Sequence, residues 1–133
     1  MIFLDTSFLV ALEVDTDISH ENAVALMNKI LDGEFGKPII SDYIFDETVT
    51  VTFSRTKDLE KATKLGTSLK KSTLIKLIDK DFDETWELFR NQKGTKLSFT
   101  DCSNLVIMKK TGTRNIATFD EDFKKIKEIN VIS

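Results

Sequence analysis

Short apolar runs alternate with longer amphipathic segments along almost the whole chain. In the longer segments hydrophobic residues recur every three or four positions, which is typical of helices with one face in a core. Helices are predicted at residues 6–13, 19–31, 59–71, 79–90 and 99–111, and a turn with a short helix at 119–126. The short runs are apolar at successive positions, as in strands buried on both faces. Strands are predicted at residues 2–4, 38–40, 73–78, 115–118 and 130–132.

Residues 48–53 fit two periods at once. They alternate with period two and are rich in β-branched side chains, which locally favours a strand. However, Ile44, Thr48, Val51 and Arg55 also share one face of a helix. We predict a helix here, because the units on either side alternate strand with helix.

The order of these elements predicts the fold class. Repeated strand–helix units favour a three-layer α/β/α fold around a central, mostly parallel sheet. The chain has 133 residues, one proline and five glycines, so a linker between domains is not expected. We therefore predict a single domain over residues 1–133.

Composition narrows the class of protein. No apolar run is long enough to span a membrane, and no basic segment precedes the first run as in a signal peptide. A lone cysteine, Cys102, excludes an internal disulfide, and we expect a cytoplasmic protein. The net charge of −3 argues against a large basic surface for nucleic acid. The same net charge is compatible with a nuclease, since a site that collects carboxylates for metal ions is itself acidic.

Carboxylates follow several of the predicted strands, at the edge where ligands bind in open α/β sheets. Asp5 and Asp79 come directly after a strand, Ser41 and Asp42 follow the strand at 38–40, and Asp120 comes two residues after the strand at 115–118. Asp101 lies in the first turn of a helix. Serine and aspartate are favoured helix N-caps, so Ser41 or Asp42 is expected to cap the helix that follows the strand at 38–40, and we interpret Asp42 and Asp79 as caps and not as catalytic residues. Asp101 also completes a capping-box pattern that begins at Ser98.

Two of these acids are not explained by capping alone. Asp5 stands between two buried runs, and Asp101 shares a helical face with Leu105 and Met108. A buried charge costs several kcal/mol unless something compensates it, and no basic residue lies near Asp5 in the sequence. A divalent cation would compensate both charges.

The residue types favour a hard cation. Several acids without a histidine or cysteine pair suit Mg²⁺ or Mn²⁺, whereas a single histidine, His20, and a single cysteine, Cys102, argue against an ordinary zinc site and a nucleophilic triad. The chain contains neither of the glycine-rich motifs that cradle nucleotide phosphates.

Four segments in order resemble the PIN-domain family, in particular its compact VapC-like toxins. These segments are the opening MIFLDTS at residues 1–7, Asp46-Glu47, LSFTD at residues 97–101 and ATFDEDF at residues 117–123. The resemblance implies a PIN-like fold and a metal-dependent endoribonuclease. By position it implies that Asp5, Glu47, Asp101 and Asp120 are catalytic and hold Mg²⁺ or Mn²⁺.

The same resemblance implies further roles. Asp122 is a candidate fifth acid, and Thr6, Ser7 and Thr100 fall where the family uses hydroxyls to support the acids. RNA is the implied substrate, and the implied setting is the toxin of a type II toxin–antitoxin pair, as a homodimer with an antitoxin partner. The basic residues that we expect beside the site, to meet RNA phosphates, are Arg55, Lys57, Lys93 and Lys96.

Two other classes of function fit parts of this pattern. A PIN-like scaffold without activity would bind RNA or protein but would lack an acid, and none of the four is missing. A haloacid-dehalogenase-like phosphatase also begins with a strand and an aspartate. It needs a second aspartate two residues later, where this chain has Ser7.

Overall fold

The fold is built on one five-stranded sheet in the computed structural model, which describes all residues, 1–133. The strand order is β3-β2-β1-β4-β5, and every neighbouring pair is parallel. The strands are β1 (Ile2–Leu4), β2 (Pro38–Ser41), β3 (Thr73–Ile75), β4 (Asn115–Ala117) and β5 (Asn130–Ile132). The predicted α/β class is confirmed, with a sheet that is parallel throughout. The third strand is shorter than predicted because the Leu77 N–H donates to Asp42 rather than to a strand.

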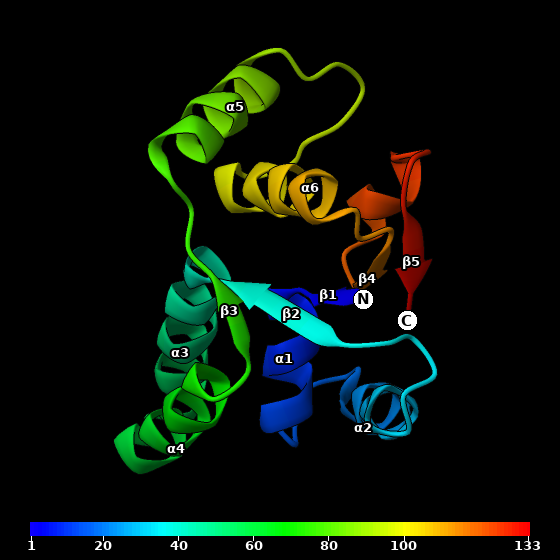
Figure 1. The fold of residues 1–133 in the computed structure, drawn as a ribbon. Helices are drawn as coiled ribbons and strands as arrows, with labels where there is room; N and C mark the ends of the chain where they lie inside the picture. Colours follow the sequence, from blue (N-terminus) through cyan, green and yellow to red (C-terminus); the bar gives the residue numbers. More distant parts are fainter.

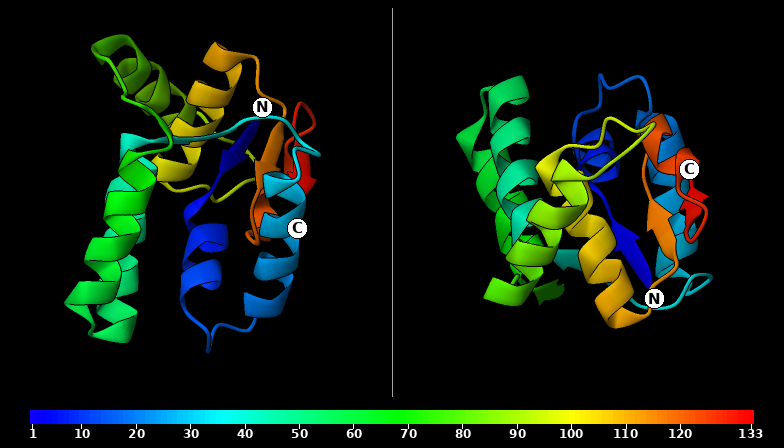
Figure 2. Two further views of the ribbon diagram at one scale, coloured as in Figure 1. Left: turned by 60° about the horizontal axis from the view of Figure 1, so that its bottom comes forward. Right: turned by 90° about the horizontal axis from the view of Figure 1, so that it is seen from above.

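Six α-helices and one 3₁₀ helix surround the sheet. They are α1 (Thr6–Glu13), α2 (His20–Leu31), α3 (Asp42–Thr56), α4 (Leu59–Lys70), α5 (Asp79–Arg90), α6 (Phe99–Thr111) and the 3₁₀ helix η1 (Glu121–Lys125). Figure 1 shows α5 and α6 on one side of the sheet and α1 and α2 on the other. The paired helices α3 and α4 lie together beyond the edge formed by β2 and β3, as both views of Figure 2 also show. None of the helices combines the length and apolar character needed to cross a membrane.

The ambiguous segment 48–53 is helical, as part of α3. Tertiary packing overrides its local preference for a strand, because Thr48 and Thr52 are fully buried on the inward face of α3. Gly66 on α4 permits the close approach of the two helices. A Cβ atom added there would lie only 3.3 Å from Cγ1 of Val49.

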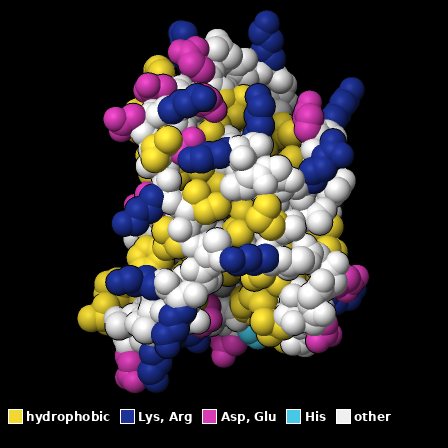
Figure 3. All heavy atoms as spheres, in the orientation of Figure 1, with side chains coloured by type: hydrophobic (Ala, Val, Ile, Leu, Met, Phe, Trp, Pro, Cys, Tyr) yellow, Lys and Arg dark blue, Asp and Glu magenta, His cyan; other side chains and the backbone are white.

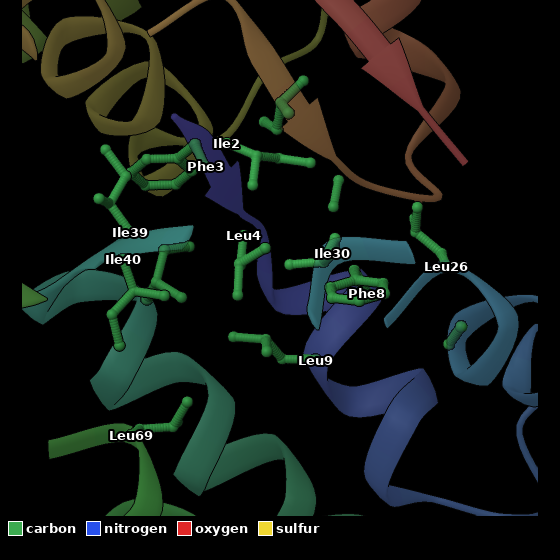
Figure 4. Close-up of a cluster of buried hydrophobic side chains, with 14 of the residues drawn as sticks. Ile2, Phe3, Leu4, Phe8, Leu9, Leu26, Ile30, Ile39, Ile40 and Leu69 are labelled. Atoms are coloured by element: carbon green, nitrogen blue, oxygen red, sulfur yellow. The ribbon is translucent and has the colours of Figure 1, made fainter. Parts of the chain in front are cut away.

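The hydrophobic core holds β1 in the middle of the molecule. Ile2 and Phe3 have no exposed surface, and Figure 4 shows their neighbours on β2, α1 and α2 closing around them. Phe8 and Leu9 of α1 continue the same cluster. The residue that follows β1 is therefore placed rigidly, with its backbone anchored from both faces of the sheet.

The N-terminus of α3 is capped by Ser41 and not by Asp42. The Ser41 hydroxyl oxygen accepts from the Ile44 N–H at 3.1 Å, while Asp42 accepts from Leu77. Asp79 likewise lies inside α5 and caps nothing, since Asp81 accepts the Ile78 N–H. Of the two residues expected to cap α3, Ser41 does so and Asp42 does not, because β2 extends one residue further than predicted, to Ser41. The predicted Asp79 cap is wrong, because β3 ends three residues earlier than predicted, at Ile75, and Ile78 occupies the N-cap position of α5.

We expect Ser41→Ala to lower the free energy of unfolding by about 1–2 kcal/mol, because it leaves the buried Ile44 N–H without a hydrogen-bond acceptor. Urea unfolding of the purified chain measures this change. Ser54→Ala, at an exposed position of the same helix, is the matched control and should change the free energy far less. Equal losses in the two variants would contradict the capping role.

Candidate active site

The carboxyl ends of β1 and β4 form the point where the strand order reverses. From β1 the chain adds β2 and β3 on one side, and it then returns to place β4 and β5 on the other side. In open parallel sheets the connections diverge at this point and leave a crevice beyond the strand ends. Asp5 follows β1 at this edge, and Thr118 and Asp120 follow β4.

Asp5 is held by side chains from three parts of the chain. Its Oδ2 atom accepts from the Ser7 hydroxyl at 2.9 Å and from the Thr118 hydroxyl at 2.7 Å. Its Oδ1 atom accepts from the amide of Asn104 on α6 at 3.0 Å. These bonds join α1, β4 and α6 to one carboxylate, so its orientation is determined by the whole fold.

The charge of Asp5 is not balanced by any cation of the chain. Only 3% of the residue is exposed, and burial raises the pKa of its carboxyl above the ordinary value. The hydrogen bonds from Thr118 and Ser7 act in the opposite direction, and the charge of Glu47 raises the pKa further. The carboxylate is thus fully bonded but electrostatically uncompensated.

Asp101 combines the two roles suggested by the sequence. Its Oδ2 atom accepts from the Ser98 N–H and its own N–H donates to the Ser98 hydroxyl, both at 3.0 Å, which completes the capping box of α6. Burial raises the pKa of the Asp101 carboxyl to about 6, and the charges of Asp5 and Asp120 add to this effect. Three acids from separate elements therefore lie within electrostatic range of one another.

Glu47 and Asp120 complete the group of four acids. Glu47 is half-buried in the second turn of α3 and is close enough to Asp5 to influence its pKa. Asp120 accepts from the Asp122 N–H at 2.9 Å, which caps η1, and its own N–H donates to Thr118. We call Asp5, Glu47, Asp101 and Asp120 the acidic cluster.

The structure does not bring every predicted residue to this cluster. Arg55 lies eight residues beyond Glu47 on α3, about 12 Å along the helix axis, and forms an ion pair with Asp17 at 2.7 Å. Arg55 is thus engaged away from the four acids, and its contact with RNA phosphates stays a prediction. Lys57 follows the end of the same helix and is equally remote.

Of Asp122 and the three predicted hydroxyl residues, only Ser7 has a side chain that contacts Asp5. The Asp122 carboxylate is 3.3 Å from the Lys125 ammonium, so it is engaged outside the cluster. Ser7 contacts Asp5 as predicted, whereas Thr6 offers Asp5 its backbone N–H and leaves its own hydroxyl without a partner. The Thr100 hydroxyl forms no bond to any of the acids; only its carbonyl is used, by Ser103.

Lys93 and Lys96 lie exposed on the loop that leads into α6. Gln92 organises this loop, because its amide donates to the Leu97 carbonyl and accepts from the Leu97 N–H, both at 2.9 Å. The two lysines therefore lie on an ordered loop that leads into the helix of Asp101, and their contact with RNA stays a prediction.

Two residues of the site were missed in the sequence. Thr118 and Asn104 contact Asp5 although they lie 113 and 99 positions from it in the sequence, and both are buried. Asn104 carried one usable signal, its spacing of three residues from Asp101, which places the two side chains on neighbouring parts of one helical face.

The donor set fits a hard divalent cation. Carboxylate oxygens are the ligands that Mg²⁺ and Mn²⁺ prefer, and the carbonyl oxygen of Asn104 is buried beside Asp5 with no partner. In this conformation no three acids are arranged as a complete ligand set. Magnesium keeps several waters and needs few protein oxygens, so two of these carboxylates would be enough to hold a hydrated ion.

Comparison with a family model and with curated proteins gives matches over almost the whole chain. A family model for the PIN domain matches residues 2–129. The 23S rRNA-specific endonuclease VapC20 of Mycobacterium tuberculosis is 29% identical over 128 residues, which cover 92% of each protein.

Solved structures share the fold. The crystal structure of Mycobacterium tuberculosis VapC20, described as a Sarcin-Ricin loop cleaving toxin, has a TM-score of 0.84 with 23% identity and covers 96% of this chain and 95% of that one. VapBC2 from Rickettsia felis, bound to a DNA fragment from its promoter, has a TM-score of 0.70 with 20% identity over 99% and 98% of the two chains.

Proposed function

The chain belongs to the PIN-domain family, and from this premise we propose that it is a metal-dependent endoribonuclease, the toxin of a toxin–antitoxin pair. The observation that carries the proposal is the buried, uncompensated carboxylate of Asp5 in the acidic cluster, at the edge where an α/β sheet binds its ligand. The function named for the curated relative, which spans 92% of both chains, supports the same activity.

We propose that Asp5, Glu47, Asp101 and Asp120 hold Mg²⁺ or Mn²⁺. When bound, the ion offsets the charge of the phosphodiester, lowers the pKa of a water and stabilises the departing 3′ oxygen. The expected products are a 5′-phosphate and a 3′-hydroxyl.

The residues around Asp5 are proposed to act by preorganisation. Ser7, Thr118 and Asn104 hold both carboxylate oxygens in one orientation, so no side-chain rearrangement of Asp5 is needed during the reaction. The alternative of a phosphatase loses support at Ser7, which donates to Asp5 where that class needs a second acid.

The proposed partners follow from the relatives. A structural neighbour is a VapBC complex, and we propose that this chain too binds an antitoxin and forms a homodimer in the cytoplasm. Because the curated relative is specific for 23S rRNA, ribosomal RNA is the first substrate to test.

The purified chain, free of any antitoxin, is expected to cut ribosomal RNA in the presence of Mg²⁺ or Mn²⁺ and to stop when the ion is chelated. End mapping of the fragments should find 5′-phosphates, and restoring Mn²⁺ after chelation should restore cleavage. Intact RNA under all metal conditions, or cleavage that persists with chelator, would contradict the proposal.

A further inference from the structure

A groove opens beside the acidic cluster, on the side away from α5 and α6. It lies between α2, the β4–η1 connection and the end of β5, and it encloses about 460 Å³. The residues that line it include Asn22, Ala25, Lys29, Phe35, Phe119 and Asp120. Its size falls in the range of sites that enclose one small ligand, about 300–1,000 Å³.

The groove is continuous with the acidic cluster through β4. Asp120 belongs to the cluster and also lines the groove. Thr118 lines it too, and the Thr118 hydroxyl donates to Asp5 at 2.7 Å. A polymer whose scissile bond lies at the acids therefore reaches the groove with its adjoining unit.

The walls of the groove combine aromatic and polar groups. Phe35 and Phe119 supply ring surface, and Phe119 is held in place by Phe8, whose ring centroid is 6.3 Å away. Asn22 offers an exposed amide that can both donate and accept. A nucleobase has the matching surfaces, with apolar faces and a hydrogen-bonding edge.

Lys29 is the basic residue of the groove that forms no ion pair. The other basic residue there, Lys124, lies 2.8 Å from Glu121, whereas Lys29 belongs to none of the ion pairs of the chain. An unpaired ammonium in a groove beside a nuclease site suits the phosphate of a neighbouring nucleotide.

Local contacts matter in this chain because its surface is not broadly basic. The net charge is −3, and the face in Figure 3 shows lysine and arginine side chains scattered among acidic and apolar ones. Binding of RNA must then draw on stacking and on a few specific contacts, as in single-strand sites with aromatic platforms.

We propose that this groove binds one unpaired nucleotide of the RNA next to the scissile bond, with the base against Phe35 and Phe119, its edge at Asn22 and its phosphate at Lys29. The proposal rests on the ribonuclease function proposed above and adds to it a preference for single-stranded or flipped-out nucleotides. The groove is thus a binding subsite that adjoins the acids proposed to carry the chemistry and shares Asp120 with them.

Ala25→Glu tests the subsite directly. It adds bulk and a negative charge inside the groove, one helical turn from Lys29. In an Asp5→Asn background with Mg²⁺ present, we expect the affinity for a short fluorescent single-stranded RNA, measured by anisotropy, to fall about tenfold or more. Asn28→Glu adds the same charge to α2 outside the groove lining, and its affinity should stay within about twofold of the background.

Lys29→Ala gives a second, independent readout. Losing one phosphate contact to a single strand should reduce the slope of log affinity against log salt by about 0.7, whereas Lys71→Ala at the end of α4 should leave the slope unchanged. The subsite is overturned if Ala25→Glu binds RNA as Asn28→Glu does, or if Lys29→Ala keeps the full salt slope. Absence of cleavage by the unmodified chain would refute the nuclease function alone, since these assays measure binding without hydrolysis.

Discussion

Asp5→Asn is expected to reduce RNA cleavage by about a thousandfold, which is the largest effect of any single substitution that we predict. The variant keeps the shape of the side chain and an oxygen that can accept from Thr118 or Asn104. It removes the negative charge that a divalent cation requires at this position. The observed rate constant with saturating Mn²⁺ and excess enzyme measures the loss.

The stability of Asp5→Asn separates a catalytic role from a structural one. Burial makes the Asp5 charge unfavourable in the metal-free chain, so its removal should leave the melting temperature unchanged or raise it. Asp15→Asn makes the same chemical change at an exposed position, and it should retain full activity. Loss of activity together with loss of the folded state would show that Asp5 acts mainly through the fold.

Asp101→Asn is expected to reduce cleavage by about a hundredfold or more while stabilising the metal-free protein above pH 6. Burial and the neighbouring acids raise the pKa of the Asp101 carboxyl from 3.8 to about 6. The folded chain therefore binds this proton more tightly than the unfolded chain. As the pH rises from about 4 to about 6 the native state loses this stabilisation, and the loss persists at higher pH.

An asparagine at this position does not titrate, so the variant should show no such loss. In urea unfolding with chelator, the difference in free energy between variant and original should be small near pH 4 and largest above pH 6. Asp83→Asn, at an exposed position on α5, should leave the pH dependence of stability unchanged. A difference that stays constant across this range would contradict the shifted pKa.

Adding Mg²⁺ or Mn²⁺ should make the original chain more stable than the Asp101→Asn variant, which is the reverse of their order in chelator. A ligand that binds only the native state stabilises it more strongly the lower its Kd, and the original chain offers the ion one more carboxylate than Asp101→Asn. The rise in melting temperature on addition of Mn²⁺ should therefore be larger for the original chain. Equal rises would remove Asp101 from the set of residues that hold the ion.

Local signals along the chain were enough to predict most of the helices and strands and part of the site. The apolar run before Asp5 predicted β1, and the spacing of Ser98 and Asp101 predicted a capping box that the structure contains. These features depend on residues a few positions apart, so nearest-neighbour sterics and hydrogen bonding are sufficient to specify them. The family motifs added the order of the four acids.

Other features depended on contacts between distant parts of the chain. Residues 48–53 became helical because Thr48 and Thr52 are buried in the packed interior, against their local preference. Arg55 pairs with Asp17 because α3 carries it away from the sheet edge.

The pairing of strands completed the site. Parallel pairing of β1 with β4 brings Thr118 to Asp5, and the packing of α6 adds Asn104. Neither contact leaves a periodic trace in the sequence, because a hydrogen bond across about a hundred residues is created by the closure of the chain. The four candidate acids and Ser7 were thus predicted from the linear sequence, whereas Thr118 and Asn104, which orient Asp5, and the groove beside it arise from the folded arrangement.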